Sequence, residues 1–120
     1  SVSQFSTVGA GAVVLQGAII GSRATIGDFC IVNTGASVDH DCELGDFSSM
    51  APGAVAGGRV HMGARSAISI GASVKHGVTI GSDAIIGANA YVHGDIPSSV
   101  VAWGSPAEVM RSRTIGDPYL

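Results

Sequence analysis

The residues best suited to chemistry in this chain are a histidine between two acids, Asp39-His40-Asp41, and a glycine eighteen residues later, Gly58. An imidazole titrates near neutral pH and can act as a general base. A glycine leaves its backbone N–H unshielded, so that this group can donate to the oxygen of a reacting carbonyl. If the two groups lie side by side, they form a base next to an oxyanion donor. The alternative is that His40 is a surface imidazole bonded to a neighbouring acid.

A repeat of six residues runs from Val2 to Pro97 and determines where these groups lie. An aliphatic residue opens almost every block, and a small residue follows four places later. No helix or hairpin meander has this register. Two columns also recur every eighteen residues: Gly9, Gly27, Gly45, Gly63 and Gly81, and Gly17, Gly35, Gly53, Gly71 and Asn89. Because Gly and Asn tolerate positive φ, both columns predict sharp corners, with three blocks in each triangular coil.

Stacked coils place residues eighteen apart next to each other. Parallel ladders at about 4.8 Å would make five coils a column about 25 Å tall. His40 is then expected about 4.8 Å from Gly58, with Ser22, His76 and Gly94 in the same column. Strand residues alternate faces, so both acids cannot point with His40 unless the corner bends the chain. Asp41 is the favoured partner.

Composition limits the class of protein. The chain has 120 residues, a net charge of −3 and six Lys and Arg, which favours one domain and argues against a nucleic-acid partner. No apolar run has membrane length and no basic leader precedes one, so we expect a soluble, cytoplasmic protein. Cys30 and Cys42 occupy small inward positions and are expected to be packing residues. The chain opens inside the repeat at Ser1, which leaves a preceding domain open.

The character of the sequence changes after the repeat. We therefore divide the chain into a repeat domain, 1–97, a closing segment, 98–113, and a tail, 114–120. Within the closing segment, Ser99 to Trp103 is expected to form one more strand. Gly104-Ser105-Pro106 predicts a turn, and Ala107 to Arg113 a short helix.

Several motifs between Val8 and Arg113 together resemble one family. They are Asn33-Thr34-Gly35-Ala36, Asp39-His40-Asp41-Cys42, Gly45-Asp46-Phe47, Ala51-Pro52-Gly53-Ala54 and Gly104-Ser105-Pro106-Ala107. The chain resembles the hexapeptide-repeat acyltransferases, most closely the sialic acid O-acetyltransferases and the N-acetyltransferases of nucleotide-linked amino sugars. The resemblance implies an all-β fold: a left-handed parallel β-helix of about five triangular coils with a short C-terminal helix or tail. It also implies a homotrimer whose acetyl-CoA sites lie between neighbouring chains.

The resemblance further implies a role for individual residues. His40 matches the general base, Asp41 the acid that assists it, and Gly58 the backbone donor to the thioester carbonyl. Asn33 matches a residue near the acceptor, whereas Ser49 stands where relatives often have a second histidine, which puts acceptor or cofactor contacts in doubt. The implied function is acetyl-CoA-dependent acetylation of a sugar amine or hydroxyl by direct transfer. Which of the two groups is the acceptor is left open.

In such relatives coenzyme A lies along the later coils and reaches the closing segment. This implies donor contacts from Gly58 and His76, and from the following residues: Ser69, Ile70, Ala88, Trp103 and Gly104. The alternatives are that His76 covers an exposed strand and that Trp103 anchors the closing segment by packing. His61 and His93 are interpreted as surface or ladder residues.

Two other functions are compatible with a β-helix. Some β-helix enzymes are carbonic anhydrases that bind Zn²⁺ through three histidines, but the histidines of this chain lack the close pair on one strand that such sites use. The other alternative is a non-catalytic structural or trimerisation β-helix that has lost its acceptor-binding domain.

Overall fold

Two-residue strands alternate with two-residue turns over most of residues 1–114, the part of the chain that the computed structural model describes. The strands form three parallel sheets, which we call A, B and C. Sheet A contains β3 (Ile19–Ile20), β6 (Ser37–Val38), β9 (Val55–Ala56), β12 (Ser73–Val74) and β15 (Tyr91–Val92). Sheet B contains β1 (Thr7–Val8), β4 (Thr25–Ile26), β7 (Glu43–Leu44), β10 (His61–Met62) and β13 (Thr79–Ile80). Sheet C contains β2 (Val13–Val14), β5 (Ile31–Val32), β8 (Ser49–Met50), β11 (Ala67–Ile68), β14 (Ile85–Ile86), β16 (Val100–Gly104) and β17 (Ala107–Ser112).

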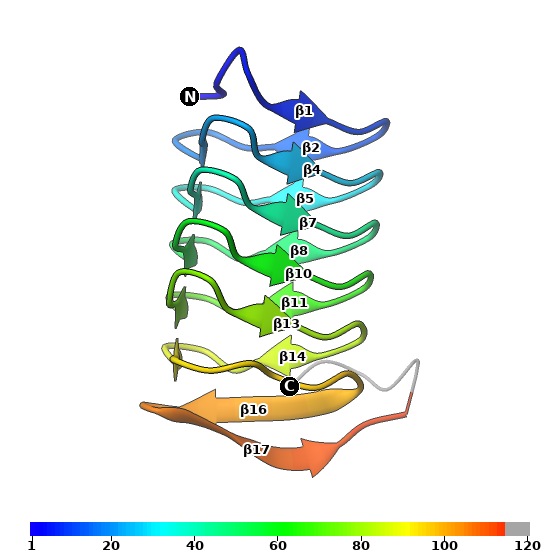
Figure 1. Cartoon of the computed structure of the whole chain (residues 1–120), viewed down its shortest axis with the longest axis vertical. Helices are drawn as coiled ribbons and strands as arrows, with labels where there is room; N and C mark the ends of the chain where they lie inside the picture. The colour runs from blue at the N-terminus through cyan, green and yellow to red at the C-terminus, as the bar shows by residue number, and fades with distance from the viewer. Residues whose placement is uncertain (115–120) are drawn as a thin grey trace.

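The sheets are the three faces of a prism that measures 38 × 26 × 21 Å (Figure 1). Each repeat strand pairs with the strand eighteen residues further on, so three six-residue blocks make one coil, as predicted. In Figure 1 the strands of sheet B face the viewer and point right, those of sheet C lie behind and point left, and the chain descends. This sense of winding is left-handed, and the predicted fold class is confirmed.

Three columns of turns form the edges of the prism, and we name each after the sheets it joins. The A–B corner holds residues 21–23, 39–41, 57–59 and 75–77. The B–C corner holds residues 9–11, 27–29, 45–47, 63–65 and 81–83, and the C–A corner holds residues 15–17, 33–35, 51–53, 69–71 and 87–89.

The core is made by the aliphatic residues that open each block and the small residues four places later. From Ile20 to Val92 every opening residue is at most 3% exposed. Burial of each large aliphatic side chain stabilises the folded state by about 1.5–3 kcal/mol relative to its exposure to water. Ala56, the smallest of them, lies in one coil with Met50 and Met62, both buried. Methionine has a long flexible side chain that fits irregular space in a core.

The two glycine columns turn out to have different causes. At the C–A corner, Gly17, Gly35, Gly53, Gly71 and Asn89 have φ between 58° and 76°, as predicted. At the B–C corner the prediction of positive φ for the column headed by Gly9 is wrong. Positive φ there falls two residues later, for example at Phe29 and Phe47. The earlier glycines are needed for close approach, since a Cβ on Gly45 would lie 2.6 Å from the backbone nitrogen of Ala64 in the next coil.

The end of the prism confirms one prediction and overturns another. The strand expected over residues 99–103 is β16, which pairs with β14 and extends sheet C. The predicted short helix over residues 107–113 is wrong, because β17 forms there and pairs antiparallel with β16. A helix of seven residues is marginal by itself, whereas pairing with β16 satisfies its backbone groups. Of the predicted tail, only Thr114 lies within the described residues.

Residues 1–114 contain no helix, and therefore none that is long and apolar enough to cross a membrane.

Candidate active site

The A–B corner brings His40 and Gly58 together, as the eighteen-residue period predicts. His40 lies in the turn between β6 and β7, and Gly58 lies in the equivalent turn of the next coil, between β9 and β10. The backbone N–H of Arg59 donates to the carbonyl oxygen of His40 over 2.9 Å, which stacks the two turns. A Cβ on Gly58 would lie 2.5 Å from Nε2 of His40. The imidazole therefore lies directly against the Gly58 α-carbon.

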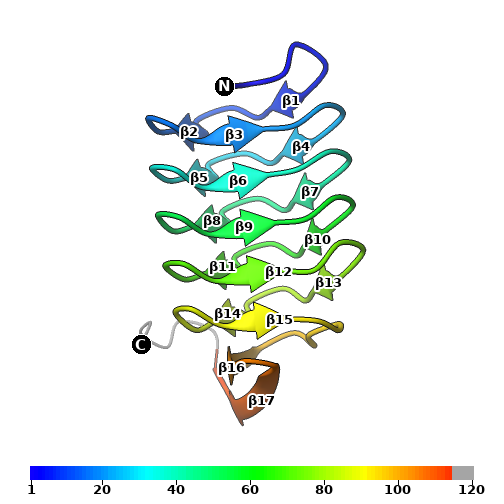
Figure 2. The same ribbon diagram turned by 90° about the vertical axis from the view of Figure 1, so that its left-hand side faces the viewer.

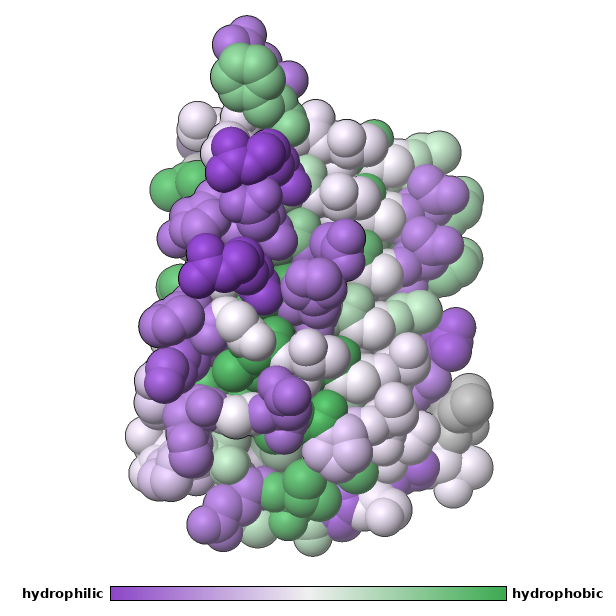
Figure 3. All heavy atoms as spheres, viewed as in Figure 1, coloured by the Kyte–Doolittle hydropathy of each residue, from purple (hydrophilic) through white to green (hydrophobic). Residues whose placement is uncertain are grey.

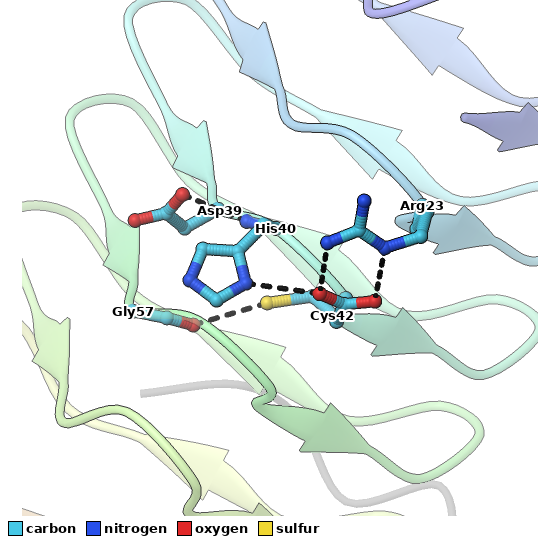
Figure 4. A network of polar contacts seen from close by, with 6 residues as sticks. Arg23, Asp39, His40, Cys42 and Gly57 are labelled. Carbon is cyan, nitrogen blue, oxygen red and sulfur yellow. Dashed lines mark hydrogen bonds and ion pairs between the residues drawn. The ribbon is translucent and has the colours of Figure 1, made fainter. Parts of the chain in front are cut away.

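The ring of His40 is paired with Asp41, the acid that the sequence favoured. Nδ1 of His40 lies 3.0 Å from Oδ2 of Asp41. Asp39 instead accepts the backbone N–H of His40 at 2.7 Å (Figure 4). Asp41 has φ 58°, a left-handed conformation that Asp tolerates better than most residues. This bend turns the carboxylate toward the preceding side chain.

Arg23 completes the network and was not identified from the sequence. Its Nε and Nη2 donate to Oδ1 and Oδ2 of Asp41, each over 2.9 Å (Figure 4). The hydrogen bond from Arg23, followed by that from His40, lowers the pKa of Asp41 to about 2. Arg23 stands eighteen residues before Asp41, so reading the column next to that of His40 would have found it.

The charge on Asp41 fixes the tautomer of His40. An ionised carboxylate only accepts hydrogen bonds, so in the neutral form of the ring the proton lies on Nδ1 and the lone pair on Nε2. Nε2 is the ring atom nearest to where a Cβ of Gly58 would lie. Gly58 itself is buried, and its N–H has no hydrogen-bond acceptor among residues 1–114. A proton acceptor thus lies beside a backbone donor that has no partner in the described part of the chain.

The two thiols are packing residues, as expected. Cys42 is buried behind the site and its Sγ donates to the carbonyl oxygen of Gly57 over 3.0 Å. Burial raises the pKa of this thiol, which makes it a poor nucleophile at neutral pH. Cys30 is also buried and donates to the carbonyl oxygen of Gly45.

The other predicted site residues lie elsewhere on the same chain. Asn33, Ser69, Ile70 and Ala88 are all at the C–A corner, and sheet A separates them from His40 (Figure 2). His76 alone joins the A–B corner, where its side chain is exposed one coil beyond Gly58.

The remaining predicted contacts lie on sheet C. Ser49 is half-buried on β8, in register between Ile31 and Ala67. Trp103 and Gly104 lie on β16, and a Cβ on Gly87 would be 2.7 Å from Cβ of Trp103. Trp103 is 40% exposed, so it packs beside the C–A corner and keeps a free face.

Sheet B holds a shallow groove of about 440 Å³, which does not include His40 among its lining residues. Nδ1 of His61 lies 2.9 Å from Oε2 of Glu43 there, in keeping with the interpretation of His61 as a ladder residue. Hydrophilic side chains gather along the left edge of this face, where the A–B corner lies (Figure 3). His93 stacks on Tyr91, with ring centroids 6.4 Å apart. Among residues 1–114, no three His, Cys, Asp or Glu side chains gather as a metal site would require.

Comparison with known proteins gives the same repeat and the same fold. The family model described as bacterial transferase hexapeptide (six repeats) matches residues 59–94. No curated protein matches the chain.

Several solved structures are similar over nearly all of this chain. A mutant of GDP-perosamine N-acetyl transferase from Caulobacter crescentus, in complex with CoA and GDP-perosamine, is 43% identical with a TM-score of 0.90, over 91% of this chain and 52% of that one. The acetyltransferase domain of PglB from Neisseria gonorrhoeae FA1090, in complex with acetyl coenzyme A, is 38% identical with a TM-score of 0.90, over 91% of this chain and 53% of that one. AntD, an N-acyltransferase from Bacillus cereus, is 15% identical with a TM-score of 0.83, over 94% and 80%, and shares the fold. The chain spans about half the length of the first two.

Proposed function

We propose that this chain, a member of the hexapeptide-repeat family, transfers the acetyl group of acetyl-CoA to the amino group of a nucleotide-linked sugar. The observation that carries the proposal is the His40–Asp41 pair lying against Gly58. Two similar proteins with TM-scores of 0.90 are an N-acetyl transferase of GDP-perosamine and an acetyltransferase domain, which favours this donor and an amine acceptor. An O-acetyltransferase would use the same base, so the acceptor atom needs a direct test.

The geometry supports direct transfer. Nε2 of His40 takes a proton from the acceptor nitrogen as that nitrogen bonds to the thioester carbon. The carbonyl oxygen gains the negative charge and accepts a hydrogen bond from the N–H of Gly58. The C–S bond then breaks, and the proton on His40 passes to the leaving thiolate, which gives coenzyme A and an amide. A positioned base contributes about 10²–10⁴-fold and one oxyanion donor about 10²–10³-fold.

The burial of Cys42 argues against a covalent acetyl-cysteine intermediate at this site. The nearest thiol, Cys42, is buried and occupied by a hydrogen bond to Gly57, and its pKa is raised. A thiolate at neutral pH is therefore disfavoured. This leaves His40 as the group that acts on the acceptor.

The positions of the predicted donor contacts favour a homotrimer. His40 and Gly58 lie at the A–B corner, whereas Ser69, Ile70 and Ala88 lie at the C–A corner of the same chain. Both groups contact one ligand if the A–B corner of one chain faces the C–A corner of the next. A ring of three prisms repeats this contact three times and closes.

The test combines binding, mass and turnover on the intact chain. Light scattering gives the mass, calorimetry gives acetyl-CoA binding, and release of the coenzyme A thiol gives turnover with GDP-perosamine and other nucleotide-linked amino sugars. The proposal expects a trimer, about one acetyl-CoA per chain, and turnover with an amino sugar that is lost in His40→Ala. Each acceptor is paired with its analogue in which hydroxyl replaces the amine. Turnover with the hydroxyl analogue alone would make the chain an O-acetyltransferase, and a trimer without acetyl-CoA binding would favour the non-catalytic β-helix.

A further inference from the structure

We propose that Arg23 is a positioning residue of the active site, which acts through Asp41 to hold His40 in the tautomer that leaves Nε2 free. The inference extends the proposed function and rests on His40 as its general base. Nothing in the His40 motif itself points to Arg23, which lies one coil away and seventeen residues earlier.

The geometry of the three side chains supports the proposal. Arg23 holds both carboxylate oxygens of Asp41 through two parallel hydrogen bonds of 2.9 Å. Such a fork fixes the plane of a carboxylate as well as its position. Oδ2 of Asp41 accepts from Arg23 and from Nδ1 of His40, so the three side chains form one chain of hydrogen bonds (Figure 4). Without Arg23, a carboxylate that is 34% exposed would be free to rotate and bond to water.

The charges around His40 give a second, independent argument for the role of Arg23. A lone carboxylate beside an imidazole stabilises the imidazolium form, which has no lone pair with which to accept a proton. The charged side chains that contact His40, directly or through Asp41, are Asp39, Asp41 and Arg23. Arg23 offsets one of the two negative charges. Removal of Arg23 makes the surroundings of His40 more negative, which favours imidazolium and should move the acidic limb of the pH–rate profile to higher pH.

The alternative is that Arg23 only stabilises the stacking of two coils through its ion pair with Asp41. A second arginine–aspartate pair in the chain serves as the control for this alternative. Arg65 and Asp83 form the same pair at the B–C corner, with Nε–Oδ1 and Nη2–Oδ2 distances of 2.9 and 3.0 Å. They too are eighteen residues apart, and both arginines have positive φ. Among the described contacts of Asp83 there is none to a histidine. Asp83 is 8% exposed and Asp41 34%, and the two pairs differ further in the third hydrogen bond, the one to His40.

The experiment compares Arg23→Met with Arg65→Met. Methionine keeps an aliphatic stem and removes the charge and the donors. In the histidine-labelled intact chain, ¹⁵N NMR reports the tautomer of each ring, and His40→Ala identifies the signals of His40. We expect Arg23→Met to shift the His40 nitrogens toward a mixture of tautomers, to lower kcat about tenfold with KM for acetyl-CoA unchanged, and to move the acidic limb to higher pH. Arg23→Lys restores the charge without the fork and should recover the pH profile more fully than the tautomer.

Two results would overturn the inference. The first is His40 signals and a pH profile in Arg23→Met that match those of the unmodified chain, and the second is an equal change in Arg65→Met. If the unmodified chain turns over no amino sugar, the proposed function fails, and the NMR comparison still decides whether Arg23 fixes the tautomer of His40.

Discussion

The substitution Gly58→Ala adds one methyl group and tests directly whether His40 must lie against the backbone at position 58. The new Cβ would lie 2.5 Å from Nε2 of His40 and 2.6 Å from Cε1. Ordinary contacts of a Cβ begin near 3.4 Å, so the ring must move by about 1 Å. The φ of Gly58 is not positive, so alanine can adopt the same backbone conformation without strain.

The size of the effect follows from these contacts. A displacement of about 1 Å in a catalytic group can cost about 10²-fold in rate. The methyl group meets only the far end of a flexible side chain and no backbone atom among its three nearest contacts. Alanine also restricts the unfolded chain, which stabilises the fold by about 0.4–1 kcal/mol. We therefore expect kcat to fall about a hundredfold while the melting temperature stays unchanged or rises slightly.

The assay is turnover by release of the coenzyme A thiol, together with thermal unfolding of the same samples. Gly94→Ala is the matched control, because Gly94 stands in the same column and has ordinary φ, and a Cβ added to it would meet nothing within 4 Å beyond its chain neighbours. It should keep full turnover. Full turnover in Gly58→Ala as well would refute the reasoning, since the base could not then depend on its position against Gly58.

Three further predictions use the same site. His40→Gln should bind acetyl-CoA in calorimetry but lose about 10²–10⁴-fold in kcat, and unmodified turnover would reject the base. The pKa of Asp41 is lowered from 3.8 to about 2, so its pairing stabilises the fold above pH 4 and this contribution is lost as the pH falls toward 2. Asp41→Asn should therefore flatten the melting temperature between pH 4 and 2, and an unchanged slope would contradict this. Because Cys42 is buried, its thiol should react with a thiol reagent only after unfolding, and rapid labelling of the folded chain would count against the packing role.

The sequence predicts the repeat and the core well because both depend on spacing alone. Three blocks of six residues return the chain to the same face, so burial follows position for residues as different as Ala56 and Met62. The same spacing places His40 against Gly58 without any knowledge of the side-chain conformation.

The failures have a common cause, since each depends on a neighbour that is distant in sequence. Position 45 needs a glycine because the backbone passes close to Ala64, and not because of its φ. Glycine suits close approach and positive φ alike, so the sequence does not tell the two causes apart. The segment of β17 is a strand because β16 offers an edge for pairing, which local helix propensity does not reveal. Arg23 stands outside the column of His40, and its role depends on a side-chain pair with Asp41 in the next coil.

The donor residues illustrate a different limit. A resemblance assigns Ser69, Ile70 and Ala88 to one ligand with His40, yet the fold of one chain puts sheet A between them. Sequence position does not say which copy of the chain supplies which half of a site. The two corners are therefore informative together: their separation within one prism is what makes an interface between prisms a requirement of the proposed function.

The adjacency of His40 and Asp41 in sequence also has a structural explanation. In a regular strand, neighbouring side chains point to opposite faces, so a His-Asp dipeptide could not form a paired ring and carboxylate. At the A–B corner, the left-handed conformation of Asp41 turns its carboxylate back to Nδ1 of His40. Gly77 has positive φ at the same position of a later coil, where no such pair is needed. Arg23 and Arg59 have the same left-handed conformation at this position of their coils, so the bend belongs to the corner and does not depend on the residue that occupies it. The corner thus converts a dipeptide into a base and its partner.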